Sequence, residues 1–205
     1  MESIVRDALV KYMKDNLLFS DKQFGFLMGR STVLQLLKVL DKWTEILDMG
    51  GSVDVIYCDF MKAFDTVPHS RLLDVLEYYS VDDPVLSWIK SFLSDRKQRV
   101  MVNGVPSSWY DVVSGIPQGS VLGPVLFVIF INTLVDVIKD SDAFMFADDT
   151  KLSKGIFCPQ DCMLLQGDID NASGWSDESH LNFHPDKMSS MRLSLKKIKV
   201  IIHIL

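Results

Sequence analysis

The sequence predicts an α+β fold, in which helices pack on a mainly antiparallel sheet. Of its 205 residues, 48% are hydrophobic and 23% are charged, which is typical of a globular chain with a real core. Stretches with apolar residues at helical spacing are mixed with short apolar runs of strand length. Their order along the chain indicates an antiparallel rather than a parallel sheet, and the absence of a linker-like segment indicates one domain or a piece of one.

The helices expected from the spacing of apolar residues cover about residues 2–18, 32–47, 70–79, 84–93, 121–139 and 160–175. Gly50-Gly51 ends the second of these helices, and Asp83 with Pro84 begins the fourth. The longest apolar stretch, VLFVIFI at 125–131, is too short to cross a bilayer and predicts a buried helix.

The expected strands cover about residues 53–60, 98–103, 109–114, 143–147, 151–153 and 188–195. The first is an apolar run that carries one carboxylate, Asp59, near its end. A turn at Asn103-Gly104 joins the second and third strands into a hairpin, because this dipeptide favours tight hairpin turns.

Charge and cysteine content restrict the classes of function. The net charge of −6 argues against a simple nucleic-acid binder, which is usually basic. Acidic clusters that bind metal, however, lower the net charge while serving polyanion chemistry, and basic residues gather at 96–99 and 196–199. Three cysteines without framework spacing indicate a reducing compartment. With no signal peptide or transmembrane segment recognised, we expect an intracellular protein of the nucleus or cytoplasm.

Three aspartates are the candidate chemical groups. Asp59 ends an apolar strand, and Asp148 and Asp149 lie side by side between two predicted strands. Carboxylates that are close together and partly buried repel one another, and a divalent cation such as Mg²⁺ relieves that repulsion. The alternative is that Asp148-Asp149 is simply a polar turn, which is the commoner use of such a pair.

Six segments of the chain resemble, in the right order, the motifs of reverse transcriptases. They are QFGFLMGRST (23–32) in the fingers, YCDFMKAFDTVPH (57–69) as motif A, SFLSDRKQRV (91–100), SGIPQGSVLGPVLFVIFIN (114–132) as motif B, FADDTKL (146–152) as motif C and LNFHPDKM (181–188) as motif D. The wording of motifs A and C is most similar to the non-long-terminal-repeat retrotransposons of the jockey-like and chicken-repeat-like type.

This resemblance implies a polymerase palm with a small antiparallel sheet on helices, a partial fingers region and no thumb. Residues 1–195 are expected to form a partial reverse transcriptase domain, with a fingers remnant at about 1–50, the palm at 51–195 and an unmatched tail at 196–205. The implied activity is RNA-directed DNA polymerisation. The implied partners are an RNA template, a DNA primer and a deoxynucleoside triphosphate (dNTP), and the thumb and endonuclease of full-length elements are not recognised.

The resemblance also assigns roles. Asp59, Asp148 and Asp149 match the catalytic metal ligands, and the backbone carbonyl of Phe60 is expected as a further ligand. These groups would hold two Mg²⁺ ions, with Mn²⁺ as a possible substitute.

Three further residues match positions that contact the nucleotide. Phe64 would exclude the 2′-hydroxyl of a ribonucleotide, Gln118 would contact the incoming nucleotide or the template, and Lys187 would protonate or neutralise the departing pyrophosphate. Their alternatives are core packing, a turn residue and an exposed lysine.

Three arginines, Arg30, Arg96 and Arg99, are candidates for contacts with template and primer phosphates. Isolated surface arginines are more often simply solvated, and this alternative stays open for each of them.

Three other interpretations stay open. The first is a catalytically inert retrotransposon remnant that at most binds nucleic acid weakly, and the second is a two-metal nuclease or phosphatase of another fold. The third adds a zinc site made by Cys158, Cys162, His180 and His184, whose spacing superficially resembles a Cys2His2 set.

Overall fold

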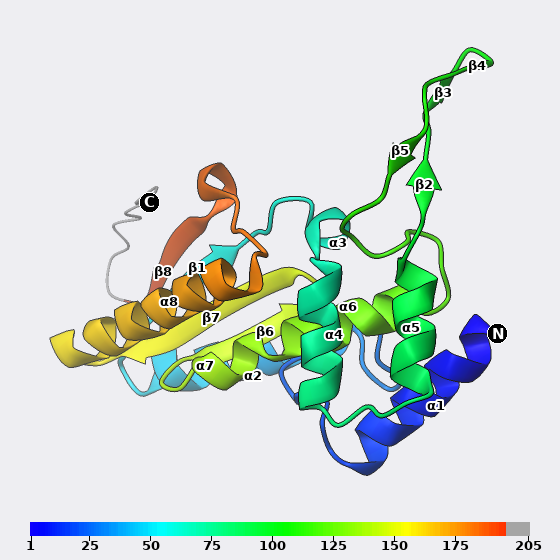
Figure 1. Cartoon of the computed structure of the whole chain (residues 1–205). Helices are drawn as coiled ribbons and strands as arrows, with labels where there is room; N and C mark the ends of the chain where they lie inside the picture. The colour runs from blue at the N-terminus through cyan, green and yellow to red at the C-terminus, as the bar shows by residue number, and fades with distance from the viewer. Residues whose placement is uncertain (196–205) are drawn as a thin grey trace.

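The computed structural model of the chain describes residues 1–195, so the predictions for the tail at 196–205 lie outside the described residues. Figure 1 shows a sheet flanked by helices, a group of helices beside it, and an arm that projects from the body. The helices are α1 (Glu2–Asp15), α2 (Thr32–Asp48), α3 (Ala63–Thr66), α4 (His69–Tyr78), α5 (Val85–Leu93), α6 (Gly123–Asn132), α7 (Leu134–Val137), α8 (Pro159–Ser179) and the 3-10 helix η1 (Pro185–Lys187).

The strands form one larger sheet and two small ladders. They are β1 (Ser52–Cys58), β2 (Lys97–Gln98), β3 (Met101–Val102), β4 (Val105–Pro106), β5 (Tyr110–Asp111), β6 (Asp142–Phe146), β7 (Asp149–Ile156) and β8 (Ser189–Ser194). The main sheet has the order β6-β7-β1-β8, and every pairing in it is antiparallel. The α+β prediction is therefore confirmed.

Each face of the main sheet is covered by a different set of helices, because the side chains of a strand alternate between the two faces. Val53 and Val55 of β1 pack with Trp43 of α2 in one cluster. Ile56 and Cys58 of the same strand belong to the larger core, which also includes residues of α6 and α8. In Figure 1, α8 crosses one face of the sheet, while α2 lies behind the other face.

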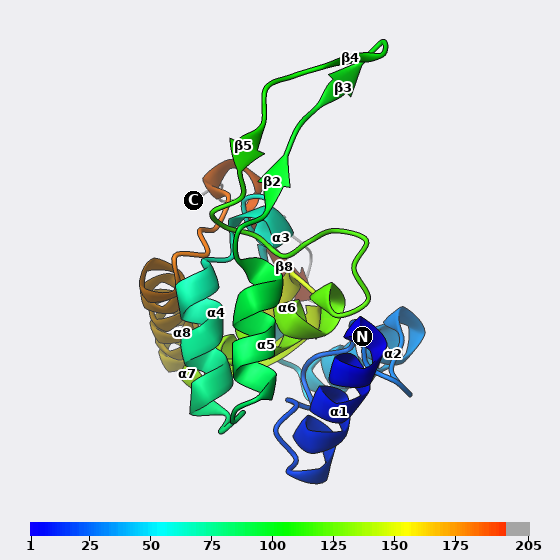
Figure 2. The same ribbon diagram turned by 45° about the vertical axis from the view of Figure 1, so that its right-hand side comes forward.

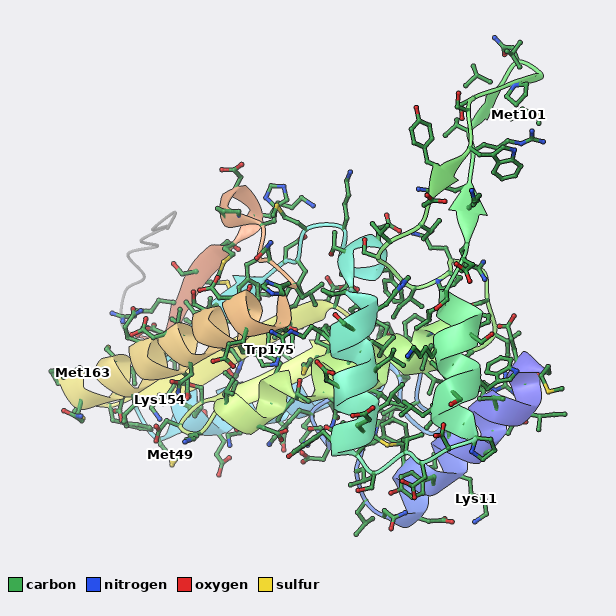
Figure 3. All side chains as sticks on the ribbon, viewed as in Figure 1. Lys11, Met49, Met101, Lys154, Met163 and Trp175 are labelled. Carbon is green, nitrogen blue, oxygen red and sulfur yellow. The ribbon has the colours of Figure 1, made fainter. Side chains whose placement is uncertain are left out.

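Helix α6 is the centre of the larger core, and all of its residues except Pro124 are buried. A helix that is apolar all round needs cover on every side, and α4 and α5 lie beside α6 in both Figure 1 and Figure 2. The single helix predicted at 121–139 is instead divided at Thr133, whose hydroxyl donates to the carbonyl of Phe130 at 3.0 Å. That hydroxyl also accepts a bond of 3.0 Å from Nε1 of Trp175 on α8, labelled in Figure 3.

The projecting arm is the hairpin predicted between 98 and 114, but its strands are shorter than expected. The β2–β5 and β3–β4 ladders each contain two residue pairs, and Asn103 and Gly104 adopt positive φ angles of 48° and 80° in the turn. Because all the ladder residues are exposed, the arm has no buried face to fix a longer register. Figure 3 shows Met101 far from the body on this arm.

Among residues 1–195, no helix has both the length and the apolar character needed to cross a membrane.

Candidate active site

The three aspartates lie at the same end of the main sheet. Asp59 directly follows β1, and Asp148 precedes Asp149, the first residue of β7. The antiparallel register pairs Cys58 with Thr150, so the end of β1 lies beside the start of β7. Asp148 and Asp149 follow Asp59 by 89 and 90 positions in the sequence, but the register places them at the neighbouring strand end, as the motif resemblance implies.

The turn that carries Asp148 is a two-residue hairpin loop. Phe146 pairs with Asp149 across it, which leaves Ala147 and Asp148 as the loop residues. Ala147 has a φ of 55°, in the left-handed region that a residue with a Cβ rarely adopts. Thr150 is buried, and its hydroxyl donates to the carbonyl of Asp148 at 3.2 Å, which fixes the far side of the turn.

The site has an excess of negative charge. Burial, as the largest cause, raises the pKa of Asp148, and the charges of Asp149 and Asp59 raise it further, against the opposing effect of a backbone hydrogen bond. No ion pair among residues 1–195 involves Asp148 or Asp149. The repulsion at Asp148 is therefore not balanced by a salt bridge within the described chain.

Asp59, in contrast, already has a cationic partner. Nζ of Lys187 lies 3.4 Å from Oδ1 of Asp59, and the backbone amide of His184 donates to the carbonyl of Asp59 at 2.7 Å. Motif D is thereby attached to motif A. In the described part of the chain, no three His, Cys, Asp or Glu side chains converge as a ready group for a metal ion.

A hollow of about 310 Å³ lies against motif B and is lined by Phe64, Ile116, Pro117, Gln118, Gly119, Gly123 and Pro124. The ring of Phe64 stacks on Phe127 of α6, with 4.1 Å between ring centroids and 19° between planes. Phe26 of the fingers segment meets the same ring edge-on at 6.2 Å. The half-buried Phe64 therefore has one side fixed by packing, while its surface contributes to the hollow.

Backbone hydrogen bonds hold the motif B loop against motif A. The amide of Ile116 donates to the carbonyl of Phe64 at 2.7 Å, and the amide of Gly115 donates to the carbonyl of Val67 at 2.8 Å. Gly115 has a φ of 86°, and a Cβ at this position would lie 2.6 Å from the carbonyl oxygen of Asp65. Only glycine permits this close approach, which explains why a glycine precedes the Pro-Gln-Gly sequence.

Gln118 has a side-chain partner that the motif resemblance does not assign. Its Nε2 donates to Oδ1 of Asp65 at 2.8 Å, and both residues are exposed. No sequence signal identifies this contact, because it joins residues 53 positions apart.

The three candidate arginines have different surroundings. Nη1 of Arg30 donates to the carbonyls of Ser20 and Gln23, so its described bonds stay within the fingers segment. Arg96 and Arg99 belong to the projecting arm, where Arg99 lies 4.6 Å from the ring centroid of Trp109. The described geometry leaves the two arm arginines more accessible to a phosphate backbone than Arg30.

The zinc interpretation is wrong for the described chain. Cys158 and Cys162 lie at the start of the 21-residue helix α8, whereas His180 and His184 follow its end. A helix of that length separates its ends by roughly 30 Å, so these four side chains cannot share one ion.

Solved structures with this arrangement define the class of the fold. The telomerase of Candida albicans, solved with a fragment of telomeric RNA, superposes with a TM-score of 0.72 at 13% identity, over 96% of this chain and 35% of that one. Apo telomerase of Candida tropicalis, truncated from its C-terminal domain, gives a TM-score of 0.71 at 12% identity, over 97% of this chain and 42% of that one. The fold is thus that of a reverse transcriptase palm with part of the fingers.

The sequence comparison then identifies the family. The family described as reverse transcriptase (RNA-dependent DNA polymerase) matches residues 1–204, so the chain belongs to it. The probable RNA-directed DNA polymerase from transposon X-element of Drosophila melanogaster is 26% identical, over 96% of this chain and 22% of that protein.

A second relative, the RNA-directed DNA polymerase from mobile element jockey of the same species, is 30% identical over 82% of this chain and 19% of that protein. The resemblance to non-long-terminal-repeat retrotransposon reverse transcriptases is therefore confirmed. The chain spans only about a fifth of the length of these relatives.

Proposed function

We propose that this chain carries the nucleotidyl-transfer centre of an RNA-directed DNA polymerase, which joins a dNTP to the 3′-hydroxyl of a primer. The observation that carries the proposal is that Asp59 and the Asp148-Asp149 turn lie at the same end of the sheet, on neighbouring strands. The family match and the mobile-element relatives support the same reaction.

The charge distribution fits divalent metal ions. Asp148 is half-buried beside two other carboxylates, and their repulsion is relieved when a cation binds. Asp59, Asp148 and Asp149, with the carbonyl of Phe60, would supply the hard oxygen ligands that Mg²⁺ prefers, and Mn²⁺ is a possible substitute. When bound, two such ions activate the attacking hydroxyl and stabilise the leaving pyrophosphate.

The side chain of Lys187 would take two positions, one at Asp59 and one at the pyrophosphate. In the described structure its ammonium neutralises Asp59. During the reaction it would release that carboxylate to the metal, turn towards the pyrophosphate and donate a proton from Nζ to a leaving oxygen. The short, exposed η1 segment that carries Lys187 suits such a movement, because its side chain is 58% exposed.

Phe64 and Gln118 would bind the nucleotide beside the carboxylates. Packing on Phe127 keeps the Phe64 ring from turning away, so this ring would exclude a 2′-hydroxyl by steric conflict. The bond from Gln118 to Asp65 holds the side-chain amide at the hollow before a ligand arrives, which reduces the entropy lost on binding.

The arm and the fingers would contact the template and the primer. Arg96 and Arg99 would meet backbone phosphates, and Trp109, which is 58% exposed, offers a stacking surface for an unpaired base. Arg30 would contribute mainly by ordering the fingers segment, since its described hydrogen bonds go to that segment.

A catalytically inert chain that retains only weak nucleic-acid binding is the second candidate. It is favoured because the three carboxylates, although they lie at one end of the sheet, do not form a ready metal-binding group among the described residues. Catalysis depends on positioning within a fraction of an ångström, so a centre that does not close around metal loses most of its rate.

Primer extension separates the two candidates. Purified chain is mixed with a primed RNA template, dNTPs and Mg²⁺ or Mn²⁺, and extended primers are resolved by length. Extension that disappears in Asp148→Ala but persists in Asp142→Ala supports the polymerase, because Asp142 lies at the opposite end of β6 and pairs with Lys42. No extension by the parental chain, with RNA binding retained, supports the inert candidate instead.

A further inference from the structure

Gln23 is a fully buried polar residue beside the catalytic turn. Its exposed fraction is 0%, although glutamine is seldom fully buried. Its Oε1 accepts bonds from the amides of Ala147 at 2.8 Å and Gly25 at 2.7 Å, and its Nε2 donates to the carbonyl of Ala147 at 3.2 Å. One side-chain amide thus satisfies both backbone groups of the residue that precedes Asp148.

The segment around Gln23 also pairs with the free edge of β6. The amide of Phe24 donates to the carbonyl of Met145 at 2.8 Å, and the amide of Met145 donates to the carbonyl of Lys22 at 2.9 Å. Gly25 approaches so closely that a Cβ there would lie 2.4 Å from the nitrogen of Ala147. The fingers segment is therefore in direct contact with the hairpin that carries the aspartates.

Arg30 fixes this segment from the other side. Its Nη1 donates to the carbonyl of Ser20 at 2.6 Å and to the carbonyl of Gln23, and its guanidinium lies 5.8 Å from the ring centroid of Phe24. Arg30 therefore binds the backbone of Gln23, and the side chain of Gln23 in turn binds the backbone of Ala147.

We propose that Gln23 is a positioning residue that sets the direction of the Asp148-Asp149 turn, and thereby couples the fingers segment to the metal-binding carboxylates. Ala147 is in the left-handed region, a conformation that persists only when surrounding contacts hold it. Because Ala147 and Asp148 share a peptide bond, rotation of the Ala147 backbone redirects the Asp148 carboxylate. The inference rests on the proposed function for its chemical consequence, but the contact itself does not depend on that function.

Gln23→Met tests the proposal, because methionine has nearly the same length and volume but cannot replace the three hydrogen bonds. Asp168→Leu is the matched control. Asp168 is 1% exposed and accepts bonds of 2.9 Å from the amides of Lys139 and Asp140, which precede the opposite end of β6. Both variants remove a buried polar side chain that satisfies backbone groups next to the same strand, so both lower the melting temperature.

Two readouts distinguish positioning from a general loss of stability. The first is hydrogen exchange of the Ala147 amide by NMR, which should accelerate about tenfold in Gln23→Met, the effect of losing one buried hydrogen bond. The second is titration with terbium ions alone, read by luminescence, in which the dissociation constant should rise about 10- to 100-fold. Asp168→Leu should leave both quantities close to the parental values.

Equal Ala147 exchange in Gln23→Met and the parental chain overturns the proposal, and so does equal terbium affinity when the parental chain binds terbium. Equal changes in Gln23→Met and Asp168→Leu also overturn it, because the effect is then one of stability. If the parental chain binds no terbium, or Asp148→Ala binds as well as the parental chain, the proposed metal function fails separately. The Ala147 exchange comparison still decides in that case whether Gln23 holds the turn.

Discussion

Replacing Lys187 by methionine should strengthen metal binding and weaken catalysis, a pair of opposite effects that few other roles of a lysine produce. Methionine keeps the apolar stem but removes the ammonium that lies 3.4 Å from Oδ1 of Asp59. A divalent ion must compete with that ammonium for the same carboxylate. Loss of the competitor therefore favours the ion, whereas loss of the proton donor slows the release of pyrophosphate.

The magnitude follows from the exposure of the pair. The two side chains are 58% and 39% exposed, so the interaction is in the range of exposed ion pairs, about 0.2–1 kcal/mol. Since 1.4 kcal/mol corresponds to tenfold in an equilibrium constant, the affinity for Mn²⁺ should rise by at most about fivefold. Turnover in primer extension should fall by about 10²- to 10⁴-fold, the usual contribution of a general acid.

The assay pairs a Mn²⁺ titration at low ionic strength with single-nucleotide extension. Lys97→Met is the matched control, because Lys97 lies 3.3 Å from Asp111 in a similarly exposed pair on the arm. That variant should leave metal affinity unchanged. Weaker or unaltered Mn²⁺ binding in Lys187→Met would refute the competition, and unaltered turnover at saturating metal would refute the proton transfer.

Three further changes give distinct expected outcomes. In Asp148→Asn, the melting temperature without metal should exceed the parental value at pH 7. The reason is that burial, and then the neighbouring carboxylates, raise the pKa of Asp148 in the folded state. The stability that Asp148 contributes is therefore fully present below its ordinary pKa of 3.8 and is lost as the pH rises through the folded-state pKa. Thermal scans from pH 3 to pH 7 should show this difference growing with pH, and a constant difference would contradict the cause. Phe64→Val should raise ribonucleotide incorporation relative to deoxynucleotide by about tenfold or more, measured by competing the two nucleotides in primer extension. Simultaneous replacement of Arg96 and Arg99 by alanine should reduce the magnitude of the slope of log affinity against log salt for primed RNA by about 2. An unchanged slope would show that neither arginine contacts a phosphate.

The helices and the principal strands could be predicted because their signals are local. Period-3.6 and short apolar patterns located α2, β1 and β6 within a residue or two of their bounds. The helix at 121–139 was predicted as one element because its apolar residues continue on both sides of Thr133. At the division, the hydroxyl of Thr133 accepts a bond from Trp175 of α8, a long-range contact that no local pattern reveals.

The candidate site was predicted from motif order rather than from periodicity. The sequence resemblance named Asp59, Asp148 and Asp149, and the sheet register brings their strand ends together. It did not reveal that Lys187 pairs with Asp59 or that Asp65 holds Gln118, because both contacts arise between separate loops. Whether the three carboxylates bind metal stays a prediction.

The sequence by itself determined the family, the α+β class and the positions of the three carboxylates, since short motifs and apolar periodicity are properties of neighbouring residues. Only the tertiary structure decided which groups surround those carboxylates. The side chain of Gln23 reaches Ala147 across 124 residues of sequence, and the burial that raises the pKa of Asp148 depends on the packed fold. Such contacts depend on strand register and on how loops meet, and neither is encoded within the motif that each residue belongs to.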